Sequence, residues 1–253
     1  MDISPIRDLA RQHLPATMAE RWLELLRPGI VLSLAGPDEE PAAWIGGTPR
    51  LPPGTDWPEW KPYGPLTFLA SLDCGALPVA SLDVPLPRNG TLLFFFHDYG
   101  TDRADAPPPD PGDATTWPQA RVLHLPHGTE AAERAAPGEV VTAPAVPLSA
   151  RLVPTSPVSD HWSVLETFGA RHIPWDFEDS IGEDATLWTG NHIGGHTPSI
   201  QGSVEAEMPG DPRDWTLLAS FHDPSRGQLL YFMIRHQDLA EGRLGRAWLH
   251  RQN

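Results

Sequence analysis

LTFLASLD, residues 66–73, and WTLLASFH, residues 215–222, nearly repeat each other. Each is a short, mainly apolar run, which is typical of a β-strand. Two further pairs keep the same order along the chain: WIGGTPRLP (44–52) matches HIGGHTPSI (192–200), and GTLLFFF (90–96) matches GQLLYFM (227–233). Three matches in one order predict that the chain contains a single strand-rich unit twice.

The other apolar runs indicate an α+β fold that is mostly antiparallel β. Further strands are predicted over residues 30–36, 121–126 and 246–250. The run over 90–97 is apolar almost throughout, which favours a central strand buried on both faces. Apolar residues recur on one face of a predicted helix near the N-terminus, namely Met18, Trp22, Leu25 and Leu26. A small helical cap is therefore expected before the sheet.

The pattern predicts an N-terminal helical segment over residues 1–36 and a duplicated unit over residues 37–253. The first copy covers about residues 40–126 and the second about residues 186–253. The copies keep nearly equal spacing from the paired glycines to Leu-Ala-Ser and diverge after it. That divergence indicates an insertion in the first copy near residues 74–86.

Composition limits the classes of function. The chain of 253 residues has 33 acidic and 18 basic residues and a formal charge of −15, so it would repel a nucleic acid backbone. Thirty Pro and 22 Gly indicate many turns, whereas ten Trp argue against disorder.

No apolar stretch approaches the roughly 20 residues of a membrane helix, and the start lacks a signal-peptide core. The single Cys74 excludes an internal disulfide and is expected to be a small buried thiol. We therefore expect a cytoplasmic protein.

The stretch WIGGTPRLPPGTDWPEW, residues 44–60, combines aromatic, proline and glycine residues in an unusual way. Its paired glycines permit a positive φ and a close backbone approach, and its prolines fix an extended path. One interpretation is structural: a Pro-rich loop pinned by Trp side chains against a sheet. The other is functional: a groove for a ligand or peptide. The candidate contact residues are Trp44, Gly46, Gly47, Trp57 and Trp60, with Gly194 and Gly195 in the second copy.

The combined motifs resemble a known family. GGTPRLPPGTDWP, PLTFLASLD, LPRNGTLLFFF and RVLHLP in the first copy, with IGGHTPSIQG, DWTLLASFHD, GQLLYFMIRHQDLA and AWLHRQ in the second, are similar to the YwqG-like family of bacterial proteins. The resemblance runs from about residue 40 to the C-terminus and implies a duplicated α+β or mostly β fold without an established activity. Some relatives look like immunity partners of secreted toxins, which is an association only. The late SFHDPSRG departs from the family's usual acidic connection, so the resemblance assigns no role to those side chains.

The histidines suggest a metal site as an alternative. His192 and His196 have the i, i+4 spacing of zinc ligands on a helix, but the glycines between them indicate a turn instead. In the repeat alignment His222 falls opposite Asp73, with Asp223 adjacent. Packing of the two copies about a twofold axis would bring these groups together, and a His₂–carboxylate set could then hold a divalent metal.

We expect a non-enzymatic binding protein without a cofactor. Its partner would be a protein, most concretely a basic toxin-like one, and neither nucleic acid nor a membrane. An acidic run is a second candidate contact for a basic partner: Asp176, Glu178, Asp179, Glu183 and Asp184. Two alternatives stay open: a metal-dependent enzyme that uses the His/Asp cluster, and a small-molecule binder with a Trp-lined cleft between the copies.

Overall fold

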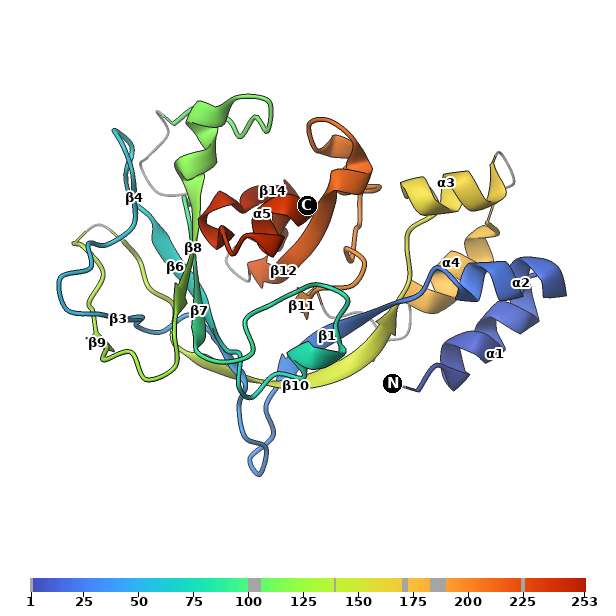
Figure 1. The fold of residues 1–253 in the computed structure, drawn as a ribbon, viewed down its shortest axis with the longest axis horizontal. Coiled ribbons are helices and arrows are strands. Elements are labelled where there is room, and N and C mark those ends of the chain that lie inside the picture. The colour runs from blue at the N-terminus through green and yellow to red at the C-terminus, as the bar shows by residue number, and fades with distance from the viewer. Residues whose placement is uncertain (1, 100–105, 139, 170–172, 183–189, 224–225) are drawn as a thin grey trace.

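The computed structural model describes the chain apart from residues 1, 100–105, 139, 170–172, 183–189 and 224–225 (Figure 1). The helices are α1 (Ser4–His13), α2 (Ala16–Leu23), α3 (Trp162–Phe168), α4 (Trp175–Gly182) and α5 (His236–Ala240). Short 3-10 turns are η1 (Val79–Ser81), η2 (Ala114–Gln119), η3 (Glu205–Glu207), η4 (Pro212–Asp214) and η5 (Leu244–Arg246). The strands are β1 (Arg27–Leu34), β2 (Ala43–Ile45), β3 (Arg50–Leu51), β4 (Glu59–Trp60), β5 (Gly64–Pro65), β6 (Thr67–Asp73), β7 (Thr91–Phe96), β8 (Ala120–Leu125), β9 (Ala132–Glu133), β10 (Val146–Thr155), β11 (His192–Ile193), β12 (Trp215–Asp223), β13 (Gln228–Arg235) and β14 (Trp248–Gln252).

Ten strands form one antiparallel sheet in the order β14-β13-β12-β11-β1-β10-β2-β6-β7-β8. The sheet curls strongly (Figure 1), and its two edges approach each other. Arg251 Nη1 in β14 donates to Gln119 Oε1, next to β8, at 2.9 Å. The expected α+β fold, mostly antiparallel β with an N-terminal helical segment, is confirmed.

The two ends of the sheet share one local plan. We call β10, β2, β6, β7 and β8 the first half, and β1, β11, β12, β13 and β14 the second half. In both halves the second long strand contains a bulge, at Leu69 in β6 and at Leu218 in β12. The N–H of Gly46 donates to the carbonyl of Leu69 at 2.7 Å, and that of Gly194 to the carbonyl of Leu218 at 3.3 Å. The limits of the two copies stay a prediction, and residues 186–189 lie outside the described residues.

The two innermost strands of the sheet are exchanged between the copies. The strand that precedes each copy in the sequence pairs with a strand of the other copy. β1 precedes the first copy in sequence, but it pairs with β11 of the second half through Ile30–Ile193. β10 follows the first copy and pairs with β2 through Val146–Ile45. β1 and β10 then pair with each other along their length, from Arg27–Thr155 to Leu34–Leu148, and this ladder joins the halves.

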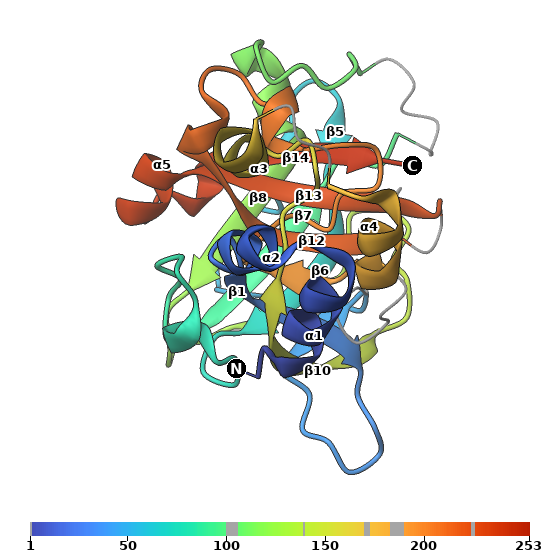
Figure 2. The ribbon, with the colours of Figure 1, turned by 90° about the vertical axis from the view of Figure 1, so that its right-hand side faces the viewer.

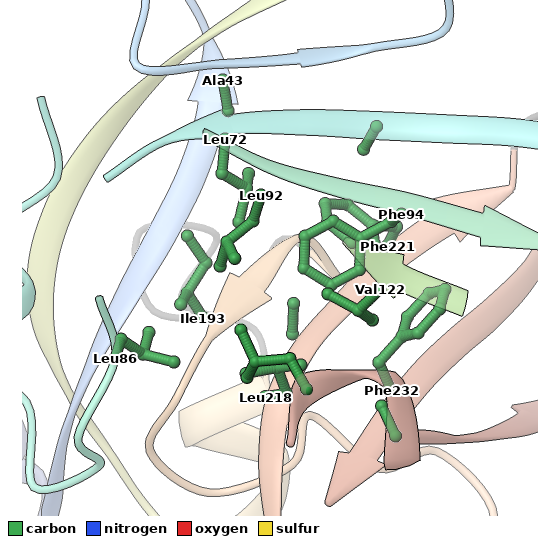
Figure 3. Packing of buried hydrophobic residues seen from close by; sticks show 14 of the residues in the cluster. Ala43, Leu72, Leu86, Leu92, Phe94, Val122, Ile193, Leu218, Phe221 and Phe232 are labelled. Carbon is green, nitrogen blue, oxygen red and sulfur yellow. The ribbon is translucent and has the colours of Figure 1, made fainter. Parts of the chain in front are cut away.

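The core fills the concave side of the curled sheet. Side chains of both halves meet there (Figure 3): the Phe94 ring lies 5.1 Å from that of Phe221 and 5.0 Å from that of Phe232, in edge-on geometry. Because side chains alternate along a strand, Leu93 and Phe95 of β7 face the opposite side and pack in a separate cluster. The prediction of a strand buried on both faces is therefore confirmed for β7.

Helices α1 to α4 gather on one side of the molecule (Figure 2). Helices α1, α2, α3 and α4 share a small apolar core of their own, in which the Trp22 ring packs edge-on against Phe177 at 4.8 Å. Trp22 is 2% exposed, so the apolar face predicted from its spacing is the buried face. The helical part ends before β1, which belongs to the sheet.

Several element limits differ from the sequence prediction. β1 begins at Arg27 and ends at Leu34, whereas the apolar run suggested residues 30–36. β14 spans Trp248–Gln252 and not residues 246–250. β10 was not predicted, because Pro147 and Pro154 lie within it and proline argues against a central strand. Both prolines lie close to the ends of β10, where fewer ladder bonds are needed.

Candidate functional site

A groove of about 880 Å³ opens on the outer face of the first half. We call it groove I. Its floor contains Trp44, Ser71 and Leu93, which lie side by side on β2, β6 and β7. Asp73 and Leu125 continue the floor, and the segments 46–50 and 126–133 form its walls. Ala70 and Leu72 point to the opposite face and belong to the main core, so the floor residues face outward.

The paired glycines build one wall of groove I. Gly46 has a φ of 72°, and a Cβ there would lie 2.5 Å from the carbonyl oxygen of Pro144. The N–H of Gly47 donates to the carbonyl of Ala143 at 2.8 Å. Only glycine permits both the left-handed conformation and this close approach, so the pair lets the chain that leads into β10 cross the end of β2.

The polar lining of groove I is acidic. Its described lining residues include the carboxylates of Asp73, Glu130 and Glu133 and one guanidinium, that of Arg50. Arg50 Nη2 donates to the carbonyl of Ala131 at 2.6 Å and thereby holds the two walls together. Asp73 Oδ1 accepts a bond from the N–H of Gly75 at 2.8 Å, while the side chain stays exposed. The groove therefore offers carboxylates to a cation beside an apolar floor.

Trp57 and Trp60 hold the Pro-rich loop against the sheet next to groove I. The Trp57 indole donates to the carbonyl of Leu66 at 2.8 Å, and its ring meets Phe95 edge-on. Trp60 is 2% exposed and donates to the carbonyl of Thr115 at 3.2 Å. Of the candidate residues in the opening stretch, Trp44, Gly46 and Gly47 line the groove, and these two tryptophans pack under the loop.

The equivalent floor of the second half is covered by the chain itself. Strand pairing places His192 where the first half has Trp44, because His192 pairs with Ser220 as Trp44 pairs with Ser71. By the same register Tyr231 replaces Leu93 and Gln252 replaces Leu125. The segment 197–203 crosses this floor and bonds to it. Tyr231 donates to the carbonyl of Pro198 at 3.0 Å.

Gln252 holds the segment 197–203 through both the oxygen and the nitrogen of its side-chain amide. Its Oε1 accepts bonds from the N–H groups of Ile200 at 2.9 Å and Gln201 at 3.3 Å. Its Nε2 donates to the carbonyl of Gly202 at 3.0 Å. Gly194 and Gly195 are buried under this region, and a Cβ on Gly195 would press on Thr155. These two glycines therefore allow close packing, as Gly46 does in the first half.

The candidate metal ligands His192, His196, His222 and Asp223 differ from one another in burial and in hydrogen bonding. His196 Nε2 donates to the carbonyl of Leu25 at 2.8 Å, and its ring meets His161 edge-on at 5.0 Å. His192 is 2% exposed, whereas His222 is exposed and Asp223 is buried. Among the described residues no group of three or more His, Cys, Asp or Glu has the geometry to hold a metal ion.

Burial keeps these histidines neutral. Burial lowers the pKa of His192 to about 4, and burial, with the charge of Arg27 adding to it, lowers the pKa of His161 to about 4. The pKa of His196 falls to about 3, again chiefly because the ring is buried. Burial and the neighbouring Asp73 raise the pKa of the Cys74 thiol to about 11, and the side chain is 1% exposed. Cys74 is thus a small buried thiol.

The acidic run is partly engaged within the molecule. Asp176 Oδ2 lies 3.2 Å from His13 Nδ1, and Glu178 Oε1 accepts a bond from the N–H of Ser159 at 2.9 Å. Glu183 and Asp184 lie outside the described residues. The acidic groups that the structure brings into a groove with Trp44 are instead Asp73, Glu130 and Glu133. The alternation of LTFLASLD, with Ser71 and Asp73 at outward positions, is the sequence signal that could have located this floor.

The family comparison covers most of the chain. A family model described as "Domain of unknown function (DUF1963)" matches residues 43–252. No curated protein matches the chain. In the described part of the structure, none of the helices has the length and apolar character needed to cross a membrane. The match includes groove I and every strand of the ten-stranded sheet except β1, and the chain therefore belongs to the DUF1963 family, whose function is unknown.

Proposed function

We propose that the protein is a binding protein that takes an extended segment of a partner protein into groove I. The observation that carries this proposal is the contrast between the two floors. The second half covers its floor with residues 197–203 of its own chain, bonded to Tyr231 and Gln252. The equivalent floor of the first half is open, so an external segment can lie where the second half places an internal one.

The chemistry of the floor specifies the segment. Leu93 and Leu125 stand where the second half has Tyr231 and Gln252. Leu93 is 1% exposed, so the half-buried Leu125 offers the apolar surface in place of hydrogen bonds to a main chain. Trp44 adds a half-buried aromatic surface to the floor. Aromatic side chains of this kind contribute strongly to binding when a partner covers them. An aliphatic or aromatic side chain of the partner fits this surface.

The charge of the groove favours a basic residue beside that apolar one. Asp73, Glu130 and Glu133 line the groove, and the one described guanidinium, Arg50, is bonded to Ala131. A Lys or Arg can lay its aliphatic stem on the floor and direct its charge to Asp73. The formal charge of −15 attracts basic proteins over a longer range.

A basic toxin is the most specific partner that fits. The resemblance to the YwqG-like family supports this choice, because some of its members look like immunity partners of secreted toxins. The acidic groove and the acidic chain are the physical features that agree with it. On this proposal the protein acts by covering a basic surface, without chemistry of its own.

Selection from a displayed library of random heptapeptides tests the proposal without assuming a sequence. We expect the enriched peptides to carry Lys or Arg next to an aliphatic or aromatic residue. For one enriched peptide, Asp73→Asn should weaken binding about tenfold, or roughly 1.4 kcal/mol, because it removes the charge. The asparagine keeps an oxygen for the N–H of Gly75, so the turn is retained. Fluorescence anisotropy of the labelled peptide measures the affinity.

Asp38→Asn is the matched control, since Asp38 is an exposed carboxylate outside the groove lining. It should leave the affinity unchanged. Trp44→Ala should lower the affinity more than Asp73→Asn does, about thirtyfold, because it removes the aromatic surface of the floor. Enrichment of acidic peptides, or equal effects of Asp73→Asn and Asp38→Asn, would show that groove I is not the contact.

A further inference from the structure

Groove I has a wall on each side, and the two walls meet at one end. The segment 126–133 forms the wall on the β8 side, and the segment 46–50 forms the wall on the β2 side. The walls meet where β3 pairs with β9, and we call these two strands the ribbon. The N–H of Arg134 extends the ribbon by donating to the carbonyl of Pro49 at 2.9 Å.

The outer face of the sheet under the ribbon is already filled. Phe68 of β6 and Phe95 of β7 are 4% and 0% exposed. Leu51 of the ribbon belongs to the same apolar cluster, and the Trp57 ring packs edge-on against Phe95 at 5.5 Å. A segment that lies along the floor therefore cannot continue past Phe68, so groove I is closed at this end.

The opposite end of groove I opens to solvent. Exposure rises along β6 from Phe68 through the half-buried Ser71 to the exposed Asp73, and Thr91, which pairs with Asp73, is half-buried. A strand advances about 3.3 Å per residue, so the floor from Phe68 to Asp73 is roughly 15 Å long. That length holds about four extended residues of a partner, which enter at the Asp73 end and stop at the ribbon.

The second half shows the alternative to a closed end. There the segment 197–203, which follows the second glycine pair, crosses the floor at Tyr231 and Gln252 and continues into η3. In the first half, the segment that follows the glycine pair forms the ribbon with β9 instead. A partner segment in groove I must therefore end where the internal segment of the second half continues. A chain end meets this condition.

The charges near the closed end favour an amino terminus over a carboxyl terminus. Glu133 lies on the ribbon and Glu130 on the wall that leads to it, and both are exposed. Arg50, which pairs with Glu133, is the one guanidinium of the described lining, and its Nη2 is bonded to the carbonyl of Ala131. Two carboxylates and one guanidinium leave this end net negative, so it attracts an α-ammonium group.

We infer that groove I takes the amino-terminal end of its partner, with the free α-ammonium group at the ribbon. This inference rests on the function proposed for groove I and specifies which part of the partner enters it. The α-ammonium group lies near Glu133, and the first side chains cover Trp44. A later Lys or Arg reaches Asp73, and the rest of the partner leaves the groove at that end.

Four forms of one peptide test the inference with the whole wild-type chain. The parent is Leu-Lys-Ala-Ala amide, and the second form is its N-acetyl derivative. The third form carries Gly-Ser-Gly-Ser before the leucine, and the fourth carries it after the last alanine. Isothermal titration calorimetry measures the four affinities. If the parent binds too weakly to measure, a peptide enriched from the library replaces it in the same four forms.

We expect the parent and the fourth form to bind equally, because the added residues of the fourth form lie outside the groove. Acetylation should weaken binding roughly tenfold or more, since it removes the positive charge near Glu133. The amino-terminal extension should weaken binding by a similar factor, because the added residues would meet the ribbon.

Glu133→Gln locates the α-ammonium group. It should bring the affinities of the free and acetylated peptides within about threefold of each other, because one partner of the charge pair is gone. Glu40→Gln is the matched control, since Glu40 is an exposed carboxylate outside the groove lining, and it should leave the difference at its wild-type value.

The outcomes separate this inference from the function on which it rests. Equal binding of all four forms that is still weakened by Asp73→Asn would overturn the inference alone. Loss of binding only in the carboxyl-terminal extension would also overturn it, because the carboxyl end would then be the one that enters. Failure of every form to bind, with no peptide enriched from the library, would overturn both.

Discussion

The two halves of the sheet show how one scaffold can either use a surface internally or leave it open. Both have the same strand order, the same bulge and the same glycine pair. In the second half, Tyr231 and Gln252 bond the segment 197–203 to the floor. In the first half, leucines occupy those two positions and the floor is a groove. The covered floor and the open floor thus carry different side chains at two equivalent positions.

The buried histidines of the second half should make the stability of the protein depend on acid. Three buried histidines, His161, His192 and His196, lie in or beside the second half, and burial lowers the pKa of each to about 3–4. Histidine in the unfolded chain has a pKa of about 6.5, so below that pH the unfolded chain binds more protons. The stability they contribute is complete above pH 6.5 and is lost as the pH falls towards 4.

The expected loss is the largest effect predicted from the comparison. Each histidine contributes up to about 1.4 kcal/mol per pH unit in this window. Urea unfolding at pH 7.5, 6.0 and 5.0 measures it, and His192→Leu should reduce the slope. An unfolding free energy that is constant from pH 7.5 to 5.0 would contradict the burial of these rings.

A smaller effect is expected when the glycine pair is broken. Gly46→Ala forces a left-handed conformation and a clash with the carbonyl of Pro144, which should lower the unfolding free energy by about 3 kcal/mol. Gly54→Ala is the control, since Gly54 also has a positive φ but open space around it, and should cost about 1 kcal/mol. Chemical denaturation compares the two. Equal losses would mean that the close approach at Gly46 is unimportant.

The smallest loss of unfolding free energy is expected from a substitution that makes the covered floor more like the open one. Gln252→Leu gives the second half the leucine that the first half has, and removes the acceptor of the Ile200 and Gln201 N–H groups. We expect a loss of about 2 kcal/mol and faster hydrogen exchange over residues 200–202. Gln237→Leu, at an exposed side chain on α5, serves as the control. If exchange in this segment is unchanged, Gln252 does not hold it in place.

Part of this contrast is visible in the sequence. The echo of WIGG in HIGG predicts that Trp44 and His192 are equivalent, and strand pairing places them so. Strands β6, β7, β12 and β13 follow from their apolar runs. β10 could not be predicted, since two prolines interrupt it and its partners lie more than a hundred residues away.

Groove I was only partly predictable for a similar reason. Trp44, Gly46 and Gly47 follow from the motif, but the motif does not distinguish them from Trp57 and Trp60, which pack under the loop. The carboxylates of Glu130 and Glu133 reach the groove through a loop whose path depends on the pairing of β3 with β9. Long-range pairing, and not local pattern, selects which residues meet.

The crossed placement of β1 and β10 has a consequence for the origin of the molecule. Each copy of the repeat is completed by a strand that precedes the other copy. In a chain with only one copy, the leading strand could pair only with a second molecule. The leading strand of that second molecule would pair with the first. A single-copy ancestor of this plan would therefore have been a strand-exchanged dimer. Duplication and fusion of its gene would place both copies and both exchanged strands in one chain.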